Sequence, residues 1–340
     1  MDKISDGIVV STRVRLARNL EGYPFPSHLK DEKQAKEIIR LVSSGLSKLD
    51  EFRLQYMDEI SDEQAVCLME NHLISPKLIK NKRYSAALIN REESVSIMIN
   101  EEDHLREQSI VKGLDLKLAY ETMSEIDSHV AKSMKFAFDE QLGYLTACPT
   151  NLGTGLRASV MQFLPALTMN GLMPKLIRSI NRLGLTVRGL YGEGSDAEGF
   201  LYQISNEVTL GVTEEEILRQ VGEVVKKVCA LEEAERHNLL KSDRALDIQD
   251  ECQRAYGILT NCAKVSTNEF VKLISKVKLG ACLGFIKLSD ISEIDSLMVK
   301  LRPTNINAAA QRPLTPLERD IYRARCAAAT LKKLAQPRQS

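Results

Sequence analysis

The sequence has no excess of either charge. Lysine plus arginine and aspartate plus glutamate each number 46 in the 340 residues, so the formal net charge is zero. A neutral chain produces no global field that would attract nucleic acid or an anionic membrane surface. We therefore expect no direct nucleic-acid partner and no membrane partner, and any phosphate site must be built locally.

Cysteine pairs and long apolar runs are also missing. The uncharged run 158–174 is the longest in the chain, and it is broken by two prolines, a glutamine and an asparagine; no signal-peptide core precedes Gly7. Scattered cysteines without a C-x-x-C pair argue against a disulfide framework or a zinc cluster. We therefore predict a cytoplasmic protein. The seven cysteines stand at positions 67, 148, 229, 252, 262, 282 and 326.

The length and the 44% hydrophobic content predict two domains with their own cores. In the first, alternation over 7–16 predicts a strand whose Arg13 and Arg15 point the same way, with Ser11, while Val10, Thr12, Val14 and Leu16 take the other face. Residues 86–99 predict a hairpin. Further strands are expected at 143–148, 159–164, 185–191 and 200–210, and helices at 105–132 and 172–183, the second ended by Gly184. This pattern predicts an α+β fold with a largely antiparallel sheet flanked by helices.

From Thr213 onward the pattern is helical throughout. A capping box of Thr213 and Glu216 opens a long charged helix to about residue 240. Beyond it, capping signals at "STNEF" and "TPLE" and a stop at Pro303 predict a helical bundle. We therefore divide the chain into an α+β domain over 1–240 and an all-helical domain over 241–340.

The stretch "ACPTNLGTGLRASV" (147–160) combines one thiol, two glycines and one arginine. Its glycines fit neither G-x-x-x-x-G-K-[ST] nor G-x-G-x-x-G, so they do not by themselves indicate a nucleotide loop. Alone, Cys148 is as well explained as a small buried hydrophobe. Arg157 and Arg188 are equally explained as surface cations, and "NEED" (100–103) as an acidic first helical turn.

Five segments taken together resemble the catalytic domain of the phosphagen kinases, the arginine and creatine kinase family. The resemblance covers about 7–240 and implies an antiparallel sheet similar to that of glutamine synthetase. The segments are "STRVRLARNL" (11–20), "NEEDHLR" (100–106), "CPTNLGTGLRASV" (148–160), "VRGLYGE" (187–193) and "EGFLYQISNEVTLGVTEEE" (198–216).

Two departures make the chain similar to the bacterial protein arginine kinases within that family. Only ten residues precede "STRVR", where phosphagen kinases have a small helical domain. About a hundred helical residues follow 240, and they contain "RDIYRA" (319–324), which matches the RDxxRA phosphoarginine-binding motif of those kinases. By this resemblance Arg319 and Arg323 hold a phosphoryl group, Asp320 holds a guanidinium, and Ala324 completes the motif. The apolar stripe of that helix is expected at Leu317, Ile321, Ala324, Ala328 and Leu331.

The resemblance implies roles for two carboxylates and the cysteine. A guanidinium with a pKa above about 12 offers no lone pair at pH 7. Removing its proton to a carboxylate before reaction costs on the order of 11 kcal/mol, so the proton leaves late, as the N–P bond forms. Glu102 is then the base, Glu193 the second carboxylate on the acceptor, and Cys148, as a thiolate held by donors such as Thr150, a third negative contact.

The resemblance also implies a site for ATP, with Mg²⁺ bound to the nucleotide mostly through water. Arginine forks would hold the phosphates. Met161 and the pair Leu190 and Tyr191 depart from metabolic arginine kinases, which have a histidine and a further arginine at those segments. The nucleotide-binding residues implied are Ser11, Thr12, Arg13, Val14, Arg15, His72, Arg106, Arg157, Ala158, Ser159, Val160, Met161, Arg188, Gly189, Leu190, Tyr191, Gly192 and Glu193.

Three functions stay open on the sequence. The first is an ATP-dependent protein arginine kinase of the stress response that marks proteins for degradation. Its implied partners are proteins with exposed arginines, a zinc-binding activator protein, a heat-shock repressor, a Clp-type ATPase and a second copy of the chain as a homodimer. The second is a kinase for free arginine, and the third is a non-catalytic adaptor that binds phosphoarginine through 319–324.

Overall fold

A computed structural model describes residues 7–47, 49, 51–189 and 198–335 of the chain. Within these residues, eight strands form one sheet in which every neighbouring pair is antiparallel. The predicted α+β class with a flanked antiparallel sheet is confirmed. In spatial order the strands are β2 (Arg53–Tyr56), β3 (Ala86–Ile89), β4 (Val95–Ile99), β5 (Leu105–Lys112), β1 (Val9–Arg18), β8 (Leu156–Phe163), β10 (Leu201–Asn206) and β9 (Leu185–Gly189).

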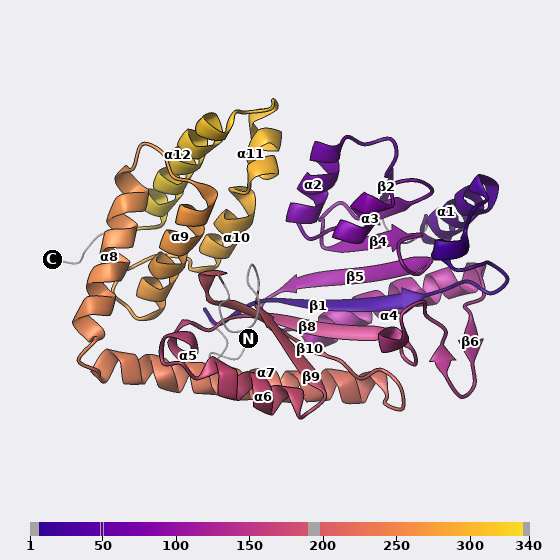
Figure 1. Cartoon of the computed structure of the whole chain (residues 1–340), viewed down its shortest axis with the longest axis horizontal. Helices are drawn as coiled ribbons and strands as arrows, with labels where there is room; N and C mark the ends of the chain where they lie inside the picture. Colours follow the sequence, from indigo (N-terminus) through magenta and orange to yellow (C-terminus); the bar gives the residue numbers. More distant parts are fainter. Residues whose placement is uncertain (1–6, 48, 50, 190–197, 336–340) are drawn as a thin grey trace.

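Helices cover both faces of this sheet, but unequally. One face packs continuously against α1, α4, α6 and α7 in the larger apolar core. The other face is covered at one end by α2 and α3 and at the other end by the helical part of the chain (Figure 1). The helices that precede the helical part are α1 (Glu32–Leu46), α2 (Asp62–Glu70), α3 (Pro76–Lys80), α4 (Leu116–Ser133), α5 (Pro165–Met169), α6 (Met173–Asn181) and α7 (Glu214–Lys241).

The helical part follows α7, which runs along the underside of the sheet and leads into the bundle (Figure 1). Its own apolar cluster also takes in Phe163 of β8 and Leu201 of β10, so the bundle packs directly onto the sheet. The division at about residue 240 stays a prediction, because α7 contributes to both clusters through Val221 and Leu239. The bundle consists of α8 (Ala245–Asn261), α9 (Thr267–Cys282), α10 (Ser292–Lys300), α11 (Pro303–Ala310) and α12 (Pro316–Leu334).

The predicted helix starts are confirmed by their caps. Thr213 accepts from the backbone N–H of Glu216, and the Glu216 side chain accepts from the backbone N–H of Thr213. The same reciprocal box opens α12 at Thr315, and Ser266 caps α9. Each cap satisfies N–H groups that the first helical turn leaves unpaired, which is why these sequence signals locate helix starts well. Pro303 does follow the end of α10, but it also occupies the first turn of α11, where its missing N–H is harmless.

Two predicted elements differ from the structure. The first eight residues of the predicted helix 105–132 are the strand β5, because Leu105–Lys112 pairs with both β1 and β4 in the middle of the sheet. Of the predicted strand 143–148, only Gly143–Tyr144 belongs to a strand, β7, which pairs with β6 (Phe138–Asp139). The predicted hairpin at 86–99 is confirmed as β3 and β4.

The predicted faces of β1 are correct with one exception. Val14 and Leu16 lie in the larger core, whereas Val10 packs against the helical cluster on the opposite face. A register shift between Val9 and Ser11 turns Val10 to the opposite face, since one extra residue reverses the side-chain alternation. The described helices include none whose length and hydropathy would let it cross a bilayer.

Candidate active site

Four strands bring five arginines to the face of the sheet that lies between α2 and the helical part. On β1, Arg13 and Arg15 are two residues apart and share this face, and Arg15 lies directly opposite Arg157 on β8. Arg106 on β5 and Arg188 on β9 reach the same face through the antiparallel register. We call this set the arginine face.

The arginine face is a concentration of positive charge. Burial lowers the pKa of Arg13 to about 10, with smaller contributions from Arg106 and Arg157. Burial likewise lowers the pKa of Arg15 well below its usual range, and the four neighbouring guanidiniums add to the effect. Among the described residues, the Nε atoms of Arg15 and Arg157 are buried without a hydrogen-bond partner. Unpaired donors in a cluster of like charges form a site for a polyanion.

Neutral and acidic side chains orient three of these arginines. Arg13 Nη2 donates to Gln203 Oε1 at 3.3 Å, and Arg157 Nη2 donates to Ser205 Oγ at 3.1 Å. Arg106 Nη1 pairs with Glu101 Oε1 at 3.0 Å. Two of the three partners are uncharged, so they fix the guanidiniums without neutralising them.

Glu101 is a residue whose role the sequence did not reveal. It is 3% exposed, accepts from Ser75 Oγ, and its Oε2 accepts from the backbone N–H of Glu102 at 3.0 Å. It therefore links Arg106 to the loop that carries Glu102. The two adjacent glutamates of "NEED" pointed to this loop, but the sequence could not indicate which of them is buried. In the structure Glu101 is buried, whereas Glu102 is half-exposed.

Glu102 lies at the end of β4, in the turn before β5. Its Oε1 is 3.1 Å from Lys77 Nζ, and it follows directly on Glu101, which holds Arg106. The next residue, Asp103, accepts from Ala147 N and from Asn19 Nδ2, both at 2.6 Å. Because Ala147 immediately precedes Cys148, this carboxylate joins the Glu102 loop to the Cys148 loop. The loops that carry the predicted base and the predicted thiol are thereby tied to each other.

The Cys148 loop is held by its glycine turn. Cys148 Sγ is 3.0 Å from Thr150 Oγ1, as predicted. Gly153 has φ +107°, and a Cβ there would lie 2.2 Å from the carbonyl oxygen of Thr209. Thr209 Oγ1 contacts the carbonyl oxygens of Thr150 at 3.0 Å and of Leu152 at 2.7 Å. Only glycine permits this approach, which lets the chain turn between Cys148 and β8.

His72 lies beside the arginine face at the end of α2. Its carbonyl oxygen accepts from Gln108 Nε2 at 2.6 Å. Burial lowers the pKa of His72 to about 4, and the positive charges of Arg302 and Arg13 contribute. The ring is therefore neutral at pH 7. Its predicted membership of the site is consistent with this position, whereas the nearby Arg302 was not foreseen.

The remaining predicted nucleotide residues divide by the pleat of the strands. Ser11, Ser159, Met161 and Arg188 share the arginine face. Gly189 stands opposite Tyr202 of the buried face. Leu190, Tyr191, Gly192 and Glu193 lie outside the described residues. The side chains of four others point into the opposite, helix-covered face and cannot contact a ligand on the arginine face, since adjacent strand residues face opposite sides; these are Thr12, Val14, Ala158 and Val160.

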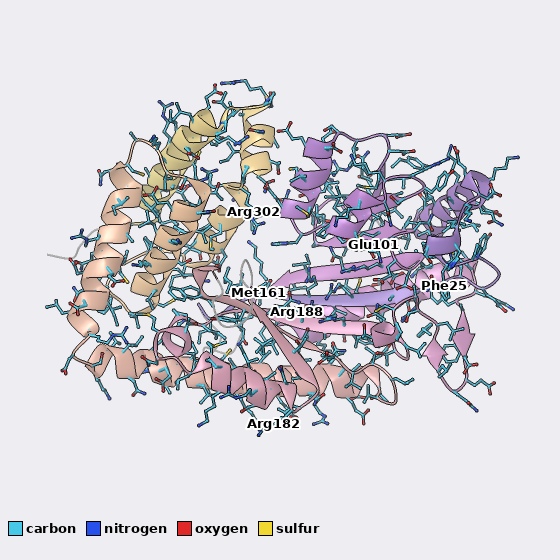
Figure 2. The ribbon with its side chains drawn as sticks, in the orientation of Figure 1. Phe25, Glu101, Met161, Arg182, Arg188 and Arg302 are labelled. Carbon is cyan, nitrogen blue, oxygen red and sulfur yellow. The ribbon has the colours of Figure 1, made fainter. Side chains whose placement is uncertain are left out.

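Met161 stands where the arginine face meets the helical part. Along one face, β8 carries Arg157, Ser159, Met161 and Phe163, which is a transition from charged to apolar side chains. Met161 packs against the helical cluster, and Phe163 belongs to it. Figure 2 shows Met161 and Arg188 in the centre of the molecule, at this junction. A thioether is suited to the junction because it fills an apolar contact without adding charge.

The 319–324 motif is placed differently from the prediction. Arg323 is 1% exposed; its Nε donates to the carbonyl oxygen of Leu301, and its Nη1 donates to Val265 O and to Asp320 Oδ1, at 2.9, 2.9 and 2.7 Å. In this structure the donors of Arg323 tie α12 to the ends of neighbouring helices, and its contact with a phosphoryl group stays a prediction. Arg319 is half-buried and Ala324 fully buried.

The reason is a rotation of the apolar stripe on α12. The buried residues are Arg323, Ala324, Ala327, Leu331 and Leu334. Leu317, placed in the predicted stripe, is 55% exposed. Ala324 and Leu331 are buried as predicted, but the centre of the buried stripe is rotated toward Arg323 and Ala327, so Arg323 lies in the core and Arg319 lies nearer the surface.

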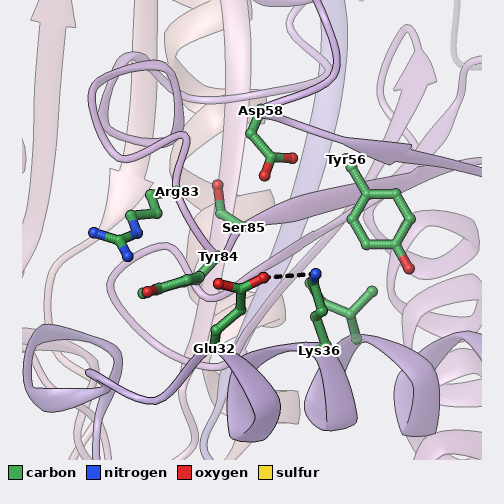
Figure 3. A pocket seen from close by; sticks show the side chains of 8 residues that line it. Glu32, Lys36, Tyr56, Asp58, Arg83, Tyr84 and Ser85 are labelled. Carbon is green, nitrogen blue, oxygen red and sulfur yellow. Dashed lines mark ion pairs between the residues drawn. The ribbon is translucent and has the colours of Figure 1, made fainter.

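Other hollows and clusters do not compete with this site. Among the described residues no group of three or more His, Cys, Asp and Glu side chains is arranged to hold a metal ion. A cavity of about 80 Å³ lies between α1 and β2, and it is lined by Glu32, Lys36, Tyr56 and Tyr84 among others (Figure 3). None of the predicted site residues lines it.

Comparisons with known proteins agree with this arrangement. Residues 33–235 match the model of the ATP:guanido phosphotransferase C-terminal catalytic domain, and residues 245–340 match the protein-arginine kinase McsB C-terminal domain. The protein-arginine kinase of Halothermothrix orenii is 44% identical over 319 residues, which are 93% of this chain and 91% of that protein. The chain belongs to the protein-arginine kinase family.

One further relative is similar over the same length, and two solved structures are similar over most of the chain. The protein-arginine kinase of Geobacillus stearothermophilus is 43% identical over 322 residues, covering 93% of this chain and 88% of that protein. A crystal structure of a lombricine kinase is 30% identical with a TM-score of 0.59, covering 67% of this chain and 66% of that one. The duplicated taurocyamine kinase of Schistosoma mansoni has a TM-score of 0.63 at 27% identity; the match covers 75% of this chain and 39% of that one.

Proposed function

We propose that this chain transfers the γ-phosphoryl group of ATP to arginine side chains of proteins. The observation that supports this most directly is the arginine face, with its buried and unpaired donors, next to the loops of Glu102 and Cys148. A cationic half suits a triphosphate, and an acidic half suits a guanidinium. The membership of the protein-arginine kinase family agrees with both.

The arginine face fits the nucleotide on its donor chemistry. Arg13, Arg15, Arg106, Arg157 and Arg188 would hold the phosphates, and His72 would stand at the nucleotide as a neutral ring. Mg²⁺ would come with the phosphates rather than in a carboxylate cage of the protein. Bound there, ATP and Mg²⁺ supply the phosphoryl group and neutralise the charge of the leaving oxygen.

On the acceptor side, Glu102 positions the guanidinium and takes its proton as the new bond forms. One N–P bond forms, the bond from the γ-phosphorus to the bridging oxygen breaks, and the proton goes from the attacking nitrogen to the carboxylate of Glu102. We propose Glu193 as the second carboxylate on the guanidinium and Cys148 as a further negative contact. Positioned carboxylates preorganise a planar cation, which lowers the entropic part of the barrier.

We extend the proposal to the setting of the activity. The family resemblance supports a cytoplasmic homodimer that acts in the stress response and marks proteins for degradation. A zinc-binding activator protein, a heat-shock repressor and a Clp-type ATPase would be its partners. In the 319–324 motif, Arg319 would contact a phosphoarginine, while Arg323 and Asp320 hold α12 in place.

A phosphorylation assay tests the central claim. Incubation with ATP, Mg²⁺ and an arginine-rich protein should give acid-labile phosphate on arginine, mapped by mass spectrometry. Phosphate on serine would overturn the assignment. Competition between free arginine and the protein substrate separates a protein kinase from a kinase for free arginine. Calorimetry with phosphoarginine on wild type and Arg319→Ala, beside the turnover assay, separates catalysis from an adaptor role.

A further inference from the structure

The helical part is joined to α2 by a helix cap that crosses between the two halves of the chain. Glu70, in the last turn of α2, is 8% exposed. Its Oε2 accepts from the backbone N–H groups of Thr304 at 3.0 Å and Asn305 at 3.2 Å, and from Thr304 Oγ1. A carboxylate at a helix N-terminus satisfies unpaired N–H groups and complements the helix dipole. Glu70 thus caps α11, 234 residues away in sequence.

An amide pair reinforces this junction. Asn71 Nδ2 donates to Asn305 Oδ1 and Asn305 Nδ2 donates to Asn71 Oδ1, each at 3.1 Å. Asn305 Nδ2 also donates to the carbonyl oxygen of Val299 at 2.9 Å. The start of α11 is therefore fixed to the residues that immediately precede His72.

Arg302 is the residue that this junction brings to the nucleotide site. It stands at the N-cap position of α11, but its side chain makes no capping hydrogen bond, because Glu70 provides that function. The carbonyl of the preceding Leu301 is held by Arg323 from α12. The chain at Arg302 is thus fixed from two sides. Figure 2 shows Arg302 on the side of the helical part that faces the sheet.

The environment of Arg302 is that of the arginine face. Burial lowers the pKa of His72, and the positive charges of Arg302 and Arg13 contribute, so a guanidinium of the helical part and one of the sheet both act on this histidine. Burial lowers the pKa of Arg302 itself, and Glu70 opposes that effect. A half-buried guanidinium next to the arginine face raises the positive potential at that face, and this favours an anion there.

We propose that Arg302 is a nucleotide-binding residue that the helical part supplies to the site on the sheet, beside His72 and positioned by Glu70 and Arg323. The proposal rests on the proposed function, in which the arginine face binds ATP. It means that the site for the nucleotide is complete only when α11 is docked on α2. Nucleotide affinity and this docking are then linked, and each favours the other.

Calorimetric titration with ADP and Mg²⁺ tests this without relying on turnover. Arg302→Ala should weaken ADP binding about tenfold, as expected for the loss of one charge-assisted contact. Arg302→Lys should recover part of it, and the KM for the protein substrate should change little. The matched control is Arg254→Ala, an exposed arginine of α8 with a weak contact to Asp250, which should bind ADP like wild type.

Glu70→Ala provides the second arm. If Glu70 acts by positioning Arg302, then Glu70→Ala weakens ADP binding, and adding Arg302→Ala causes little further loss. Circular dichroism and thermal melts confirm that each variant is folded. Independent, multiplying losses from Glu70→Ala and Arg302→Ala would overturn the positioning role.

Arg157→Ala distinguishes failure of this inference from failure of the proposed function. If Arg157→Ala abolishes ADP binding while Arg302→Ala binds ADP like wild type, the inference about Arg302 is wrong and the arginine face stands. If neither variant affects ADP binding, the proposed nucleotide site is wrong as well.

Discussion

The two halves of the candidate site are built in different ways. The donor half consists of arginines on β5, β1, β8 and β9, four strands of one antiparallel sheet whose pleat aligns their side chains. The acceptor half consists of loops, and its alignment depends on single contacts such as Asp103 to Ala147 and Thr209 to Thr150. The donor half therefore inherits the rigidity of the sheet, whereas the acceptor half needs each of its tethers.

This difference suits the chemistry of each half. Five clustered guanidiniums repel one another and need a scaffold that keeps them together without a ligand, which a central antiparallel sheet provides. The acceptor half has to admit side chains of different proteins, and loops can adjust to them. We therefore expect damage to the strand half to affect nucleotide binding, and damage to the loop half to affect catalysis and acid stability.

The largest expected effect comes from Glu102→Gln. The variant keeps the size of the side chain but removes the base, so turnover should fall about a thousandfold, within the usual range for general-base catalysis. ADP binding should stay as in wild type, since Glu102 belongs to the acceptor half. Steady-state kinetics and calorimetry measure both quantities, with Glu121→Gln on exposed α4 as the control. A comparable loss of ADP affinity would contradict the separation of the halves.

Acid should lower the stability of the protein by protonating His104, which follows Glu102 and Asp103 in the acceptor half. Its Nδ1 accepts from Leu20 N at 3.1 Å, and its Nε2 bonds to Pro24 O at 2.9 Å. Protonation of Nδ1 would place its new N–H against the backbone N–H of Leu20. Burial lowers the pKa of His104 to about 4, while the unfolded chain has the ordinary value of 6.5. The contribution is present above pH 6.5 and is lost as the pH falls toward 4.

We expect this loss to reach about 3 kcal/mol of unfolding free energy. Urea unfolding of wild type and His104→Asn between pH 7 and pH 4 measures it as a change in their difference. His72, with a similarly lowered pKa, adds a parallel loss in both proteins and cancels in the comparison. A difference that stays constant over this range would show that His104 does not link the loop to acid stability.

A smaller effect is expected for the tether at Asp103. Asp103→Ala leaves Ala147 N and the Asn19 amide without their acceptor, and turnover should fall about tenfold as the Cys148 loop loosens. Asp103→Asn keeps an acceptor oxygen and should retain most activity. Burial raises the pKa of Asp103, because it disfavours the ionised carboxylate. We therefore expect turnover to depend more on the hydrogen bonds that Asp103 accepts than on its charge. Equal losses in both variants would favour charge over positioning.

The smallest effect is expected far from both halves, in the cavity between α1 and β2 (Figure 3). The pair Glu32 and Lys36 is exposed to solvent, so its contribution to stability should be small. Lys36→Ala should leave ADP binding and turnover unchanged, and shift the thermal midpoint only slightly. A clear kinetic effect would mean that the acceptor site extends to this surface.

Local patterns predicted the parts of the fold that local forces decide. Residues only a few positions apart form the capping boxes at Thr213 and Thr315 and the hairpin 86–99. These elements can therefore be predicted from short stretches of sequence. The segment 105–112 was misread as a helix, because its strand character comes from pairing with β1 and β4. A short polar segment carries no periodicity strong enough to indicate such partners.

The candidate site divides in the same way. The common direction of Arg13 and Arg15 follows from alternation, but the burial of Arg323 follows from which side of α12 meets the bundle. A small rotation of the buried stripe on α12 places Arg323, which was predicted to contact a ligand, in the core of the bundle. Family resemblance could name the motif, but it could not indicate which of its residues faces outward in this chain.

The sequence by itself determined the antiparallel α+β class and the helix starts, because alternation and capping are local properties, and its resemblance to a known family named the set of arginines. Only the tertiary structure decided that Glu101 holds Arg106, that Asp103 joins the loops of Glu102 and Cys148, and that Glu70 ties α11 to α2. These contacts join residues that no local pattern pairs, and they form only when the sheet and the bundle have packed and excluded water.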